Sequence, residues 1–197
     1  DIDGVEIHFI HKRSPHTAAT PLLITHGWPG SVLEYLDILD ALTDPTRHGG
    51  KPDDAFHVVL PALPGFGFSG KPRDTGTGVP KIATLWETLM GRLNYSEFHA
   101  HGGDWGSIIT QAILLQEETS CTAGHCTLTI VLPDETSLAE PQPAELDALE
   151  SFQFYNDWDS GYSKQQSTRP QTLGYGLADS PSGQMAWIVE KFAFWMD

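Results

Sequence analysis

Asp104 has the most specific chemical setting in the sequence, at the centre of Gly102-Gly103-Asp104-Trp105-Gly106. These five residues have the spacing of a nucleophile elbow, G-x-S-x-G, with aspartate in place of serine. Small residues on both sides permit a sharp turn between a strand and a helix, which holds the central residue exposed in a strained backbone conformation. The positive end of the following helix favours an ionised carboxylate. The pattern predicts a nucleophilic aspartate, although an aspartate that only caps a helix starting near Ser107 fits the same residues.

A second turn, His26-Gly27-Trp28-Pro29, can bring a backbone donor to the same point. It directly follows a predicted strand at residues 21–25, as the elbow follows one at residues 97–101. The N–H groups of Trp28 and Trp105 would then converge as an oxyanion hole, a pair of donors that stabilises developing negative charge. For His26 we favour a structural role, in which the buried ring fastens the loop through a hydrogen bond, over the role of a catalytic base.

A third turn satisfies G-x-G-x-x-G between Gly65 and Gly70, the fingerprint of dinucleotide-binding sites. Such a site needs a helix that opens directly on the last glycine, so that its N-terminus meets the pyrophosphate. Here Lys71-Pro72-Arg73-Asp74 continues the loop. We therefore predict a glycine-rich surface loop and no cofactor.

Short apolar runs that alternate with helical patterns must position these turns. The periodicity predicts strands at residues 5–10, 21–25, 55–63, 97–101 and 126–132, with helices at 32–39, 82–93 and 107–116. This alternation is typical of an α/β fold, with a mostly parallel sheet and helices on both of its faces.

The pattern changes after Pro133, where strand signals stop. We predict a helix at residues 146–155, a polar loop at 157–171, and a last helix that Ser180 caps and Pro181 opens. Residues 1–133 would then form a partial α/β core, and residues 134–197 a partial helical cap.

Composition limits the partners of this chain. Eleven lysines and arginines against 26 aspartates and glutamates give the 197 residues a net charge of −15, which disfavours nucleic acids and anionic membrane surfaces. No apolar run approaches the ~20 residues that cross a bilayer. Cys121 and Cys126 have neither zinc nor redox spacing, so we expect reduced packing residues, no metal site and a cytoplasmic location.

Four motifs together resemble one family: His26 to Gly30, Pro64 to Ser69, His101 to Gly106 and Gly161 to Thr172. In order and spacing they are similar to the α/β-hydrolase-fold epoxide hydrolases, above all the microsomal-type branch and its bacterial and fungal relatives. The resemblance runs over essentially the whole chain.

The resemblance implies an activity and a role for each matching residue. Asp104 would attack an epoxide carbon to form an ester, and the N–H groups of Trp28 and Trp105 would form the oxyanion hole for its hydrolysis. Tyr162 would donate a proton to the epoxide oxygen, which suits a phenol whose ordinary pKa is about 10. The partners would be water and a small apolar epoxide that is opened to a vicinal diol, and an oligomer is compatible with the sequence.

One part of the family pattern is missing. A histidine held by a carboxylate activates the water in this family, and both lie after the cap. Of the nine histidines only His125 follows Asp104, and it precedes the cap. The family's second cap tyrosine and the last strands of its sheet also have no counterpart. We therefore expect part of a longer enzyme that is alkylated once on Asp104 and not regenerated.

Two other functions stay open. A haloalkane dehalogenase-like hydrolase would use the same aspartate and bind the leaving halide near Trp105, although a halide needs no phenolic acid. A catalytically dead, truncated binding protein is the alternative from another class.

Overall fold

The chain divides into two units in the computed structural model, Asp1–Ile130 and Val131–Asp197. The structure describes residues 1–131 and 133–196. Within those ranges, every strand belongs to unit 1, while unit 2 is built from helices.

Unit 1 is organised by a five-stranded sheet with the order β1-β3-β2-β4-β5. Its strands are β1 (Phe9–Lys12), β2 (Thr20–Thr25), β3 (Phe56–Pro61), β4 (Phe98–Gly102) and β5 (Cys121–Cys126). β1 runs antiparallel to β3, and the other neighbouring strands are parallel. The predicted α/β architecture with a mostly parallel sheet is confirmed.

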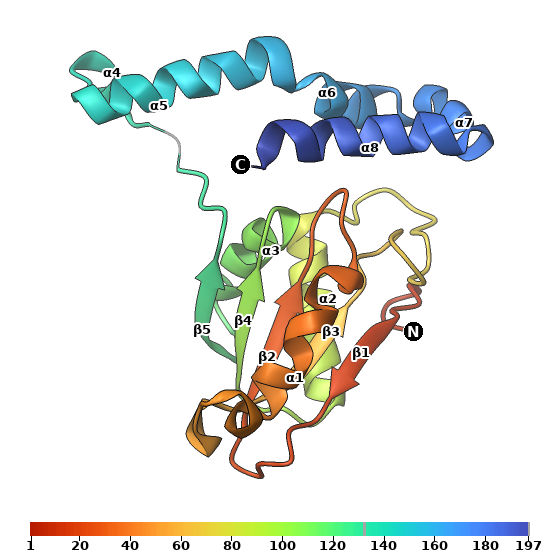
Figure 1. The fold of residues 1–197 in the computed structure, drawn as a ribbon, viewed down its shortest axis with the longest axis vertical. Helices are drawn as coiled ribbons and strands as arrows, with labels where there is room; N and C mark the ends of the chain where they lie inside the picture. The colour runs from red at the N-terminus through yellow and green to blue at the C-terminus, as the bar shows by residue number, and fades with distance from the viewer. Residues whose placement is uncertain (132, 197) are drawn as a thin grey trace. The chain divides into compact units, whose positions relative to one another are not determined.

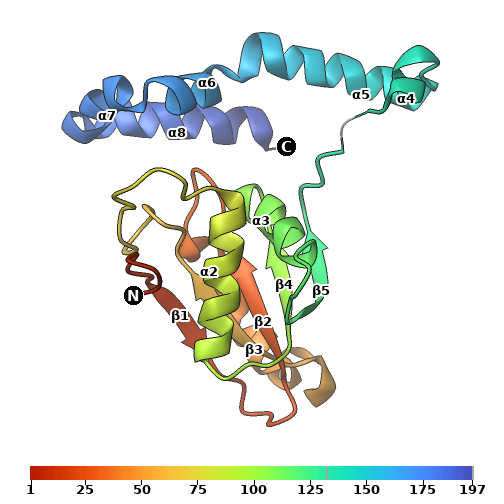
Figure 2. The same ribbon diagram turned by 180° about the vertical axis from the view of Figure 1, so that it is seen from behind.

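Helices cover both faces of this sheet because successive strand residues point to opposite sides. Leu23 and Val59 belong to an apolar core with α2 (Val79–Arg92) and α3 (Trp105–Leu114). Leu22 and Val58 belong to a second core with η1 (Val32–Ile38) and α1 (Leu39–Thr43). Figure 1 looks onto the α1 side and Figure 2 onto the α2 side. The short helices η2 (Pro45–His48) and η3 (Pro52–Asp54) lead from α1 to β3.

The strand predicted at residues 5–10 begins later than expected. β1 starts at Phe9, residues 6–8 are irregular, and residues 2–5 form a tight turn closed by one bridge between Ile2 and Val5. Asp3 and Gly4 have φ values of 49° and 81°, which shape this turn.

The strand predicted at residues 126–132 is wrong, because β5 occupies Cys121–Cys126. Leu128, Ile130 and Val131 suggested a strand, but they are exposed and follow it. β5 lies at the edge of the sheet and consists of small and polar residues, so its position is set by backbone pairing with β4. Leu132 lies outside the described residues.

Unit 2 contains more helix than its sequence pattern indicates. Its elements are α4 (Glu135–Ala139), α5 (Pro143–Phe154), the π-helix η4 (Tyr155–Asp159), α6 (Gly161–Thr168), α7 (Pro170–Asp179) and α8 (Pro181–Trp195). The polar loop predicted at 157–171 is therefore wrong. Its glycine, serine and glutamine residues carry no apolar periodicity, yet they form α6, and Pro170 opens α7. The cap of the last helix is confirmed, because the Ser180 hydroxyl accepts the Gly183 N–H.

Candidate active site

The two turns with predicted chemistry leave the same edge of the sheet. β2 and β4 are parallel neighbours, and their ladder pairs Thr25 with Gly102. The carboxyl ends of such strands are where open α/β sheets bind ligands. The segments that carry Trp28 and Asp104 therefore start side by side.

Asp104 occupies a strained turn between β4 and α3, with φ 50° and ψ −124°. It stands at the N-cap position of α3, but its side chain accepts no capping hydrogen bond from that helix. The capping interpretation is therefore wrong, and the carboxylate is left for another partner.

The glycines of the elbow are required by close backbone contacts. A Cβ on Gly102 would lie 2.0 Å from the carbonyl oxygen of Gly106. A Cβ on Gly106 would lie 1.9 Å from the carbonyl oxygen of Thr25, so α3 starts directly against the end of β2. These contacts explain why small residues flank Asp104.

Trp28 and Asp104 are joined by a hydrogen bond. The Trp28 N–H donates to Asp104 Oδ1 at 2.8 Å, and a Cβ on Gly27 would lie 2.2 Å from the same oxygen. Oδ2 accepts no hydrogen bond from any residue that the structure describes. Trp105 is the first residue of α3, so its N–H is among those without a partner inside the helix. The structure thus brings Trp28, Asp104 and Trp105 together.

His26 is buried and has the structural role expected from the sequence. Its Nε2 accepts the Leu63 N–H at 3.1 Å, so Nδ1 carries the proton and donates to the Gly27 carbonyl oxygen at 3.0 Å. Burial lowers the pKa of His26, although the Gly27 carbonyl and the charge of Asp104 oppose this shift. A neutral ring therefore ties the turn after β2 to the segment after β3.

Ser107 stabilises the elbow through two hydrogen bonds of its hydroxyl group. Its hydroxyl donates to the Gly102 carbonyl oxygen at 2.6 Å and accepts the Leu128 N–H at 3.1 Å. The side chain is fully buried. Ser107 therefore links the end of β4 to the segment that follows β5.

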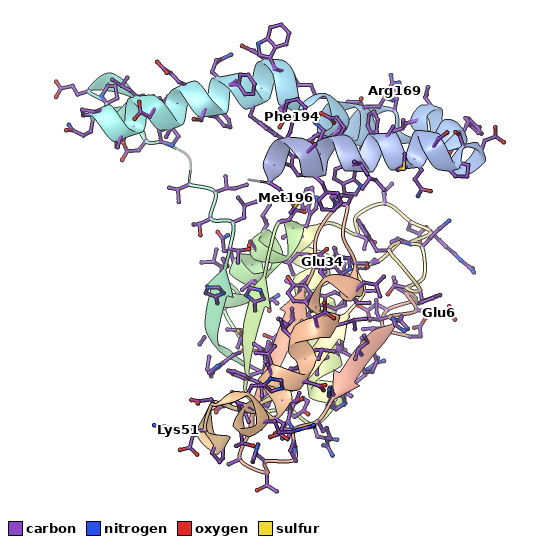
Figure 3. The ribbon with its side chains drawn as sticks, viewed as in Figure 1. Glu6, Glu34, Lys51, Arg169, Phe194 and Met196 are labelled. Atoms are coloured by element: carbon purple, nitrogen blue, oxygen red, sulfur yellow. The ribbon has the colours of Figure 1, made fainter. Side chains whose placement is uncertain are left out.

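Two residues near the elbow were not singled out from the sequence, Glu34 and Tyr35. The Glu34 carboxylate forms a capping box with Ser31 at the start of η1, and Figure 3 labels it there. Partial burial raises the pKa of Glu34, the Ser31 N–H opposes this, and the charge of Asp104 raises it further. The signal was available, because S-x-x-E before a helix is a capping-box pattern.

Tyr35 is buried, and its hydroxyl lies next to the elbow residue Gly103. Burial and the charge of Glu34 raise its pKa to about 12, against a hydrogen bond with the backbone of Gly103. Its hydroxyl lies 3.7 Å from where a Gly103 Cβ would be. Tyr35 lies within the helix predicted at residues 32–39, but no sequence signal pairs it with Gly103.

The histidine that follows Asp104 in the sequence does not contact it. His125 lies in β5 opposite His101, with the two Nδ1 atoms 2.9 Å apart. Burial and His125 lower the pKa of His101. In residues 1–131 and 133–196, no histidine ring is hydrogen-bonded to Asp104.

Tyr162 belongs to unit 2, in the first turn of α6 rather than in a loop. Its hydroxyl lies 3.3 Å from that of Tyr155, and its ring meets the Trp195 ring edge-on with centroids 5.2 Å apart. Proximity to Tyr155 was missed because seven residues separate the two in a segment that we predicted to be partly loop.

The glycine-rich turn after β3 is closed on itself and on the N-terminal segment. The Gly65 N–H donates to the Gly70 carbonyl oxygen at 2.9 Å, and the Gly70 N–H to that of Glu6 at 2.7 Å. The next helix, α2, begins only at Val79.

Within the described ranges, no group of three or more histidine, cysteine, aspartate or glutamate side chains is placed to hold a metal ion. Nor does any described helix have the length and apolarity needed to cross a bilayer.

Comparisons with known proteins fit this geometry. The model of the alpha/beta hydrolase fold matches residues 20–177, which is most of the chain. The chain belongs to the α/β-hydrolase fold family. A model described as the epoxide hydrolase N terminus matches residues 1–35 of this α/β-hydrolase.

The relatives of this α/β-hydrolase include epoxide hydrolases. A putative epoxide hydrolase of Stigmatella aurantiaca is 51% identical over 100% of this chain and 44% of its own length. The solved Aspergillus niger epoxide hydrolase is 33% identical with a TM-score of 0.83, over 97% of this chain and 50% of that one. The juvenile hormone epoxide hydrolase of the silkworm Bombyx mori is 30% identical with a TM-score of 0.87, over 99% and 49%. The resemblance to epoxide hydrolases is confirmed, and the chain spans about half the length of these relatives.

Proposed function

We propose that this α/β-hydrolase acts on small apolar epoxides, with Asp104 as the nucleophile. The hydrogen bond from the Trp28 N–H to Asp104 Oδ1 carries this proposal. It holds one carboxylate oxygen and leaves Oδ2 for attack on an epoxide carbon. The strained elbow supports the same role, since such strain is common at catalytic residues.

The first step converts the epoxide to an ester. Oδ2 forms a bond to the carbon while the carbon–oxygen bond of the ring breaks, and Tyr162 donates its proton to the departing oxygen. The ester carbonyl oxygen is then Oδ1, which already accepts the Trp28 N–H. As water adds, negative charge develops on Oδ1, and the N–H groups of Trp28 and Trp105 stabilise it.

Hydrolysis of the ester needs a base that activates water, and we propose that this base lies outside the 197 residues. The ring of His125 is hydrogen-bonded to that of His101, and the ring of His26 is hydrogen-bonded to the backbones of Gly27 and Leu63. The 197-residue chain would therefore be alkylated once, as a part of a longer hydrolase.

The nature of the substrate follows from the residues around the elbow. Trp105 is 48% exposed beside Asp104 and offers an indole surface to an apolar group.

The free thiols of Cys121 and Cys126 support a proposed location in the reducing cytoplasm.

Intact mass spectrometry after incubation with styrene oxide tests the proposal. We expect the mass of one styrene oxide to be added, and peptide mapping to place it on Asp104. Asp104→Asn keeps the shape of the side chain and should remain unmodified. Steady diol production over many turnovers, or equal labelling of the Asp104→Asn variant, would contradict the mechanism. Halide release from simple haloalkanes at a higher rate than epoxide labelling would favour a dehalogenase instead.

A further inference from the structure

Lys191 is the feature of unit 2 that the proposed reaction leaves unexplained. It is 5% exposed, and it is the one buried lysine, arginine, aspartate or glutamate in the part of the chain that the structure describes. A buried charge is costly unless it is paired and hydrogen-bonded. Its partners therefore indicate what this cation is held for.

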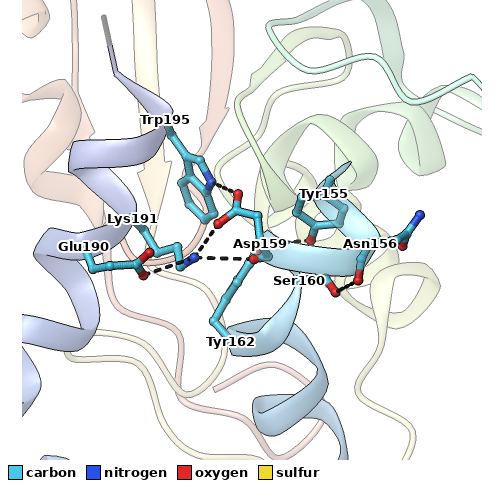
Figure 4. Close-up of polar contacts among 8 residues, drawn as sticks. All are labelled: Tyr155, Asn156, Asp159, Ser160, Tyr162, Glu190, Lys191 and Trp195. Carbon is cyan, nitrogen blue, oxygen red and sulfur yellow. Dashed lines mark hydrogen bonds and ion pairs between the residues drawn. The ribbon is translucent and has the colours of Figure 1, made fainter. Parts of the chain in front are cut away.

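Asp159 holds the ammonium group in place. Lys191 Nζ donates to Asp159 Oδ1 at 2.6 Å, and the Trp195 indole N–H donates to Asp159 Oδ2 at 2.8 Å (Figure 4). Glu190 lies 3.1 Å from Nζ, but its carboxylate is 48% exposed and therefore screened by water. Burial disfavours the charged lysine, yet the hydrogen bonds to Asp159 and Glu190 outweigh it and raise the pKa of Lys191. The side chain is thus a fixed cation.

The cation lies against the ring of Tyr162. Nζ is 5.1 Å from the centroid of the Tyr162 ring and 5.7 Å from that of Trp195, and the two rings pack edge-on. A cation within about 6 Å of an aromatic ring is attracted by its π-electrons. The ion pair therefore places a positive charge beside the phenol ring.

The local backbone fits this arrangement. Asp159 ends the π-helix η4, and Tyr162 stands in the first turn of the helix α6 that follows. Single π-helical turns are rare and are frequent at functional sites. Ser160, which joins the two helices, is the other buried residue among the described residues of unit 2.

We propose that Lys191, held by Asp159, is a positioning residue that orients Tyr162 and favours the loss of its proton to the epoxide oxygen. This rests on the proposed role of Tyr162 as the acid. When the ring of the epoxide opens, the Tyr162 O–H proton moves to the departing oxygen and leaves a phenolate. The charge of Lys191 stabilises that phenolate, while Lys191 itself keeps all its protons.

The test is a double-mutant cycle on the full 197-residue chain. The rate of Asp104 alkylation by styrene oxide is followed by intact mass for Lys191→Met, Tyr162→Phe and the double variant. We expect Lys191→Met to react roughly tenfold more slowly, because the phenolate loses a stabilising charge. The loss is no larger because the accompanying Asp159 weakens the field of the cation. In the Tyr162→Phe background, Lys191→Met should cause no further slowing, because its effect passes through the phenol. Lys191→Arg keeps the charge and should recover most of the rate.

Three controls separate this role from a structural one. Lys164→Met removes an exposed lysine of α6 and should leave the rate unchanged. An alkyl bromide needs no proton on its leaving group, so it should label Asp104 equally fast with and without Lys191. If Lys191→Met unfolds the helices, as seen by circular dichroism, Asp159→Asn/Lys191→Met removes both charges together and takes its place.

Each outcome decides one of the two proposals. Equal slowing by Lys191→Met in both backgrounds, slowing with the bromide, or full recovery in the doubly neutralised variant would show a structural ion pair and overturn the inference. If Tyr162→Phe slows epoxide labelling but Lys191→Met does not, only the role of Lys191 is lost. If Tyr162→Phe has no effect, the assignment of Tyr162 as the acid falls, and the inference with it.

Discussion

The Trp28 N–H donates to Oδ1 of Asp104 across a separation of 76 residues, at 2.8 Å. The contact exists because β2 and β4 are adjacent and parallel, with Thr25 opposite Gly102. It is supported by the absence of a side chain at Gly27, where a Cβ would lie 2.2 Å from Oδ1. The position of the proposed nucleophile therefore depends on residues from two separate turns.

Gly27→Ala should displace Asp104. The added methyl group would lie 2.4 Å from the Asp104 Cβ as well as against Oδ1, so the side chain must move. A shift of about 1 Å can cost a hundredfold in rate, and we expect a loss of that order in alkylation by styrene oxide. Gly91→Ala is the matched control, since nothing lies within 4 Å of its Cβ position in α2. An unchanged rate in Gly27→Ala would contradict the arrangement.

Stability should fall in mild acid. Burial is the main cause that lowers the pKa of four histidines below their ordinary value of 6.5: His11, His26, His57 and His101. These rings bind protons more readily in the unfolded chain, so their contribution is complete above pH ~6.5 and is lost as the pH falls below it.

Urea unfolding between pH 7.5 and pH 5.5 measures this effect. Each ring contributes at most ~1.4 kcal/mol per pH unit to the slope of the unfolding free energy. His26→Asn should flatten the slope, whereas His48→Gln, at an exposed position, should leave it unchanged. A free energy that stays constant in the unaltered chain would refute the prediction.

Ser107→Ala should destabilise unit 1. The substitution removes the donor to the Gly102 carbonyl and leaves the Leu128 N–H without its acceptor. An unsatisfied buried group costs about 1–3 kcal/mol, which a shift of the urea midpoint would reveal. Ser151→Ala, at an exposed site in α5, is expected to change little. Equal midpoints for the two variants would exclude the proposed link.

Tyr155→Phe should slow epoxide labelling by a modest factor. Its hydroxyl is 3.3 Å from that of Tyr162, a long hydrogen bond that helps to orient the phenol. An interaction of about 0.5–1.5 kcal/mol corresponds to a few-fold change in rate. Tyr175→Phe is a suitable control, because Tyr175 is 69% exposed. A loss as large as that of Tyr162→Phe would instead make Tyr155 a proton donor.

The elbow could be predicted because its chemistry is local. A side chain at Gly102 would collide with the backbone of Gly106 in the same turn, and one at Gly106 would collide with the end of the adjacent strand. The glycine spacing in the sequence therefore identifies the local fold. The same holds for the turn at His26, whose neighbours are set by the preceding strand. The pattern of apolar residues was enough to place the ends of β2 and β4 to within one residue.

β5 and α6 could not be predicted because neither carries apolar periodicity. β5 is held by its backbone ladder with β4, and four of its six residues are exposed. α6 has a polar sequence, with Gln166 accepting a hydrogen bond from Trp187 in α8 at 2.9 Å. The pairing of Lys191 with Asp159 was hidden for the same reason, since only the packing of α8 against these helices brings them together.

The backbone of Asp104 has a consequence for how this sequence can change. A non-glycine residue at φ 50° costs about 1–3 kcal/mol, which glycine would avoid. The exposed Asn94 also has a positive φ, at 63°, but asparagine is one of the residue types enriched in that region, so glycine would gain less there. A library screened only for resistance to heat should therefore accept glycine at position 104 and discard the nucleophile. Aspartate at position 104 survives only where the reaction itself is under selection.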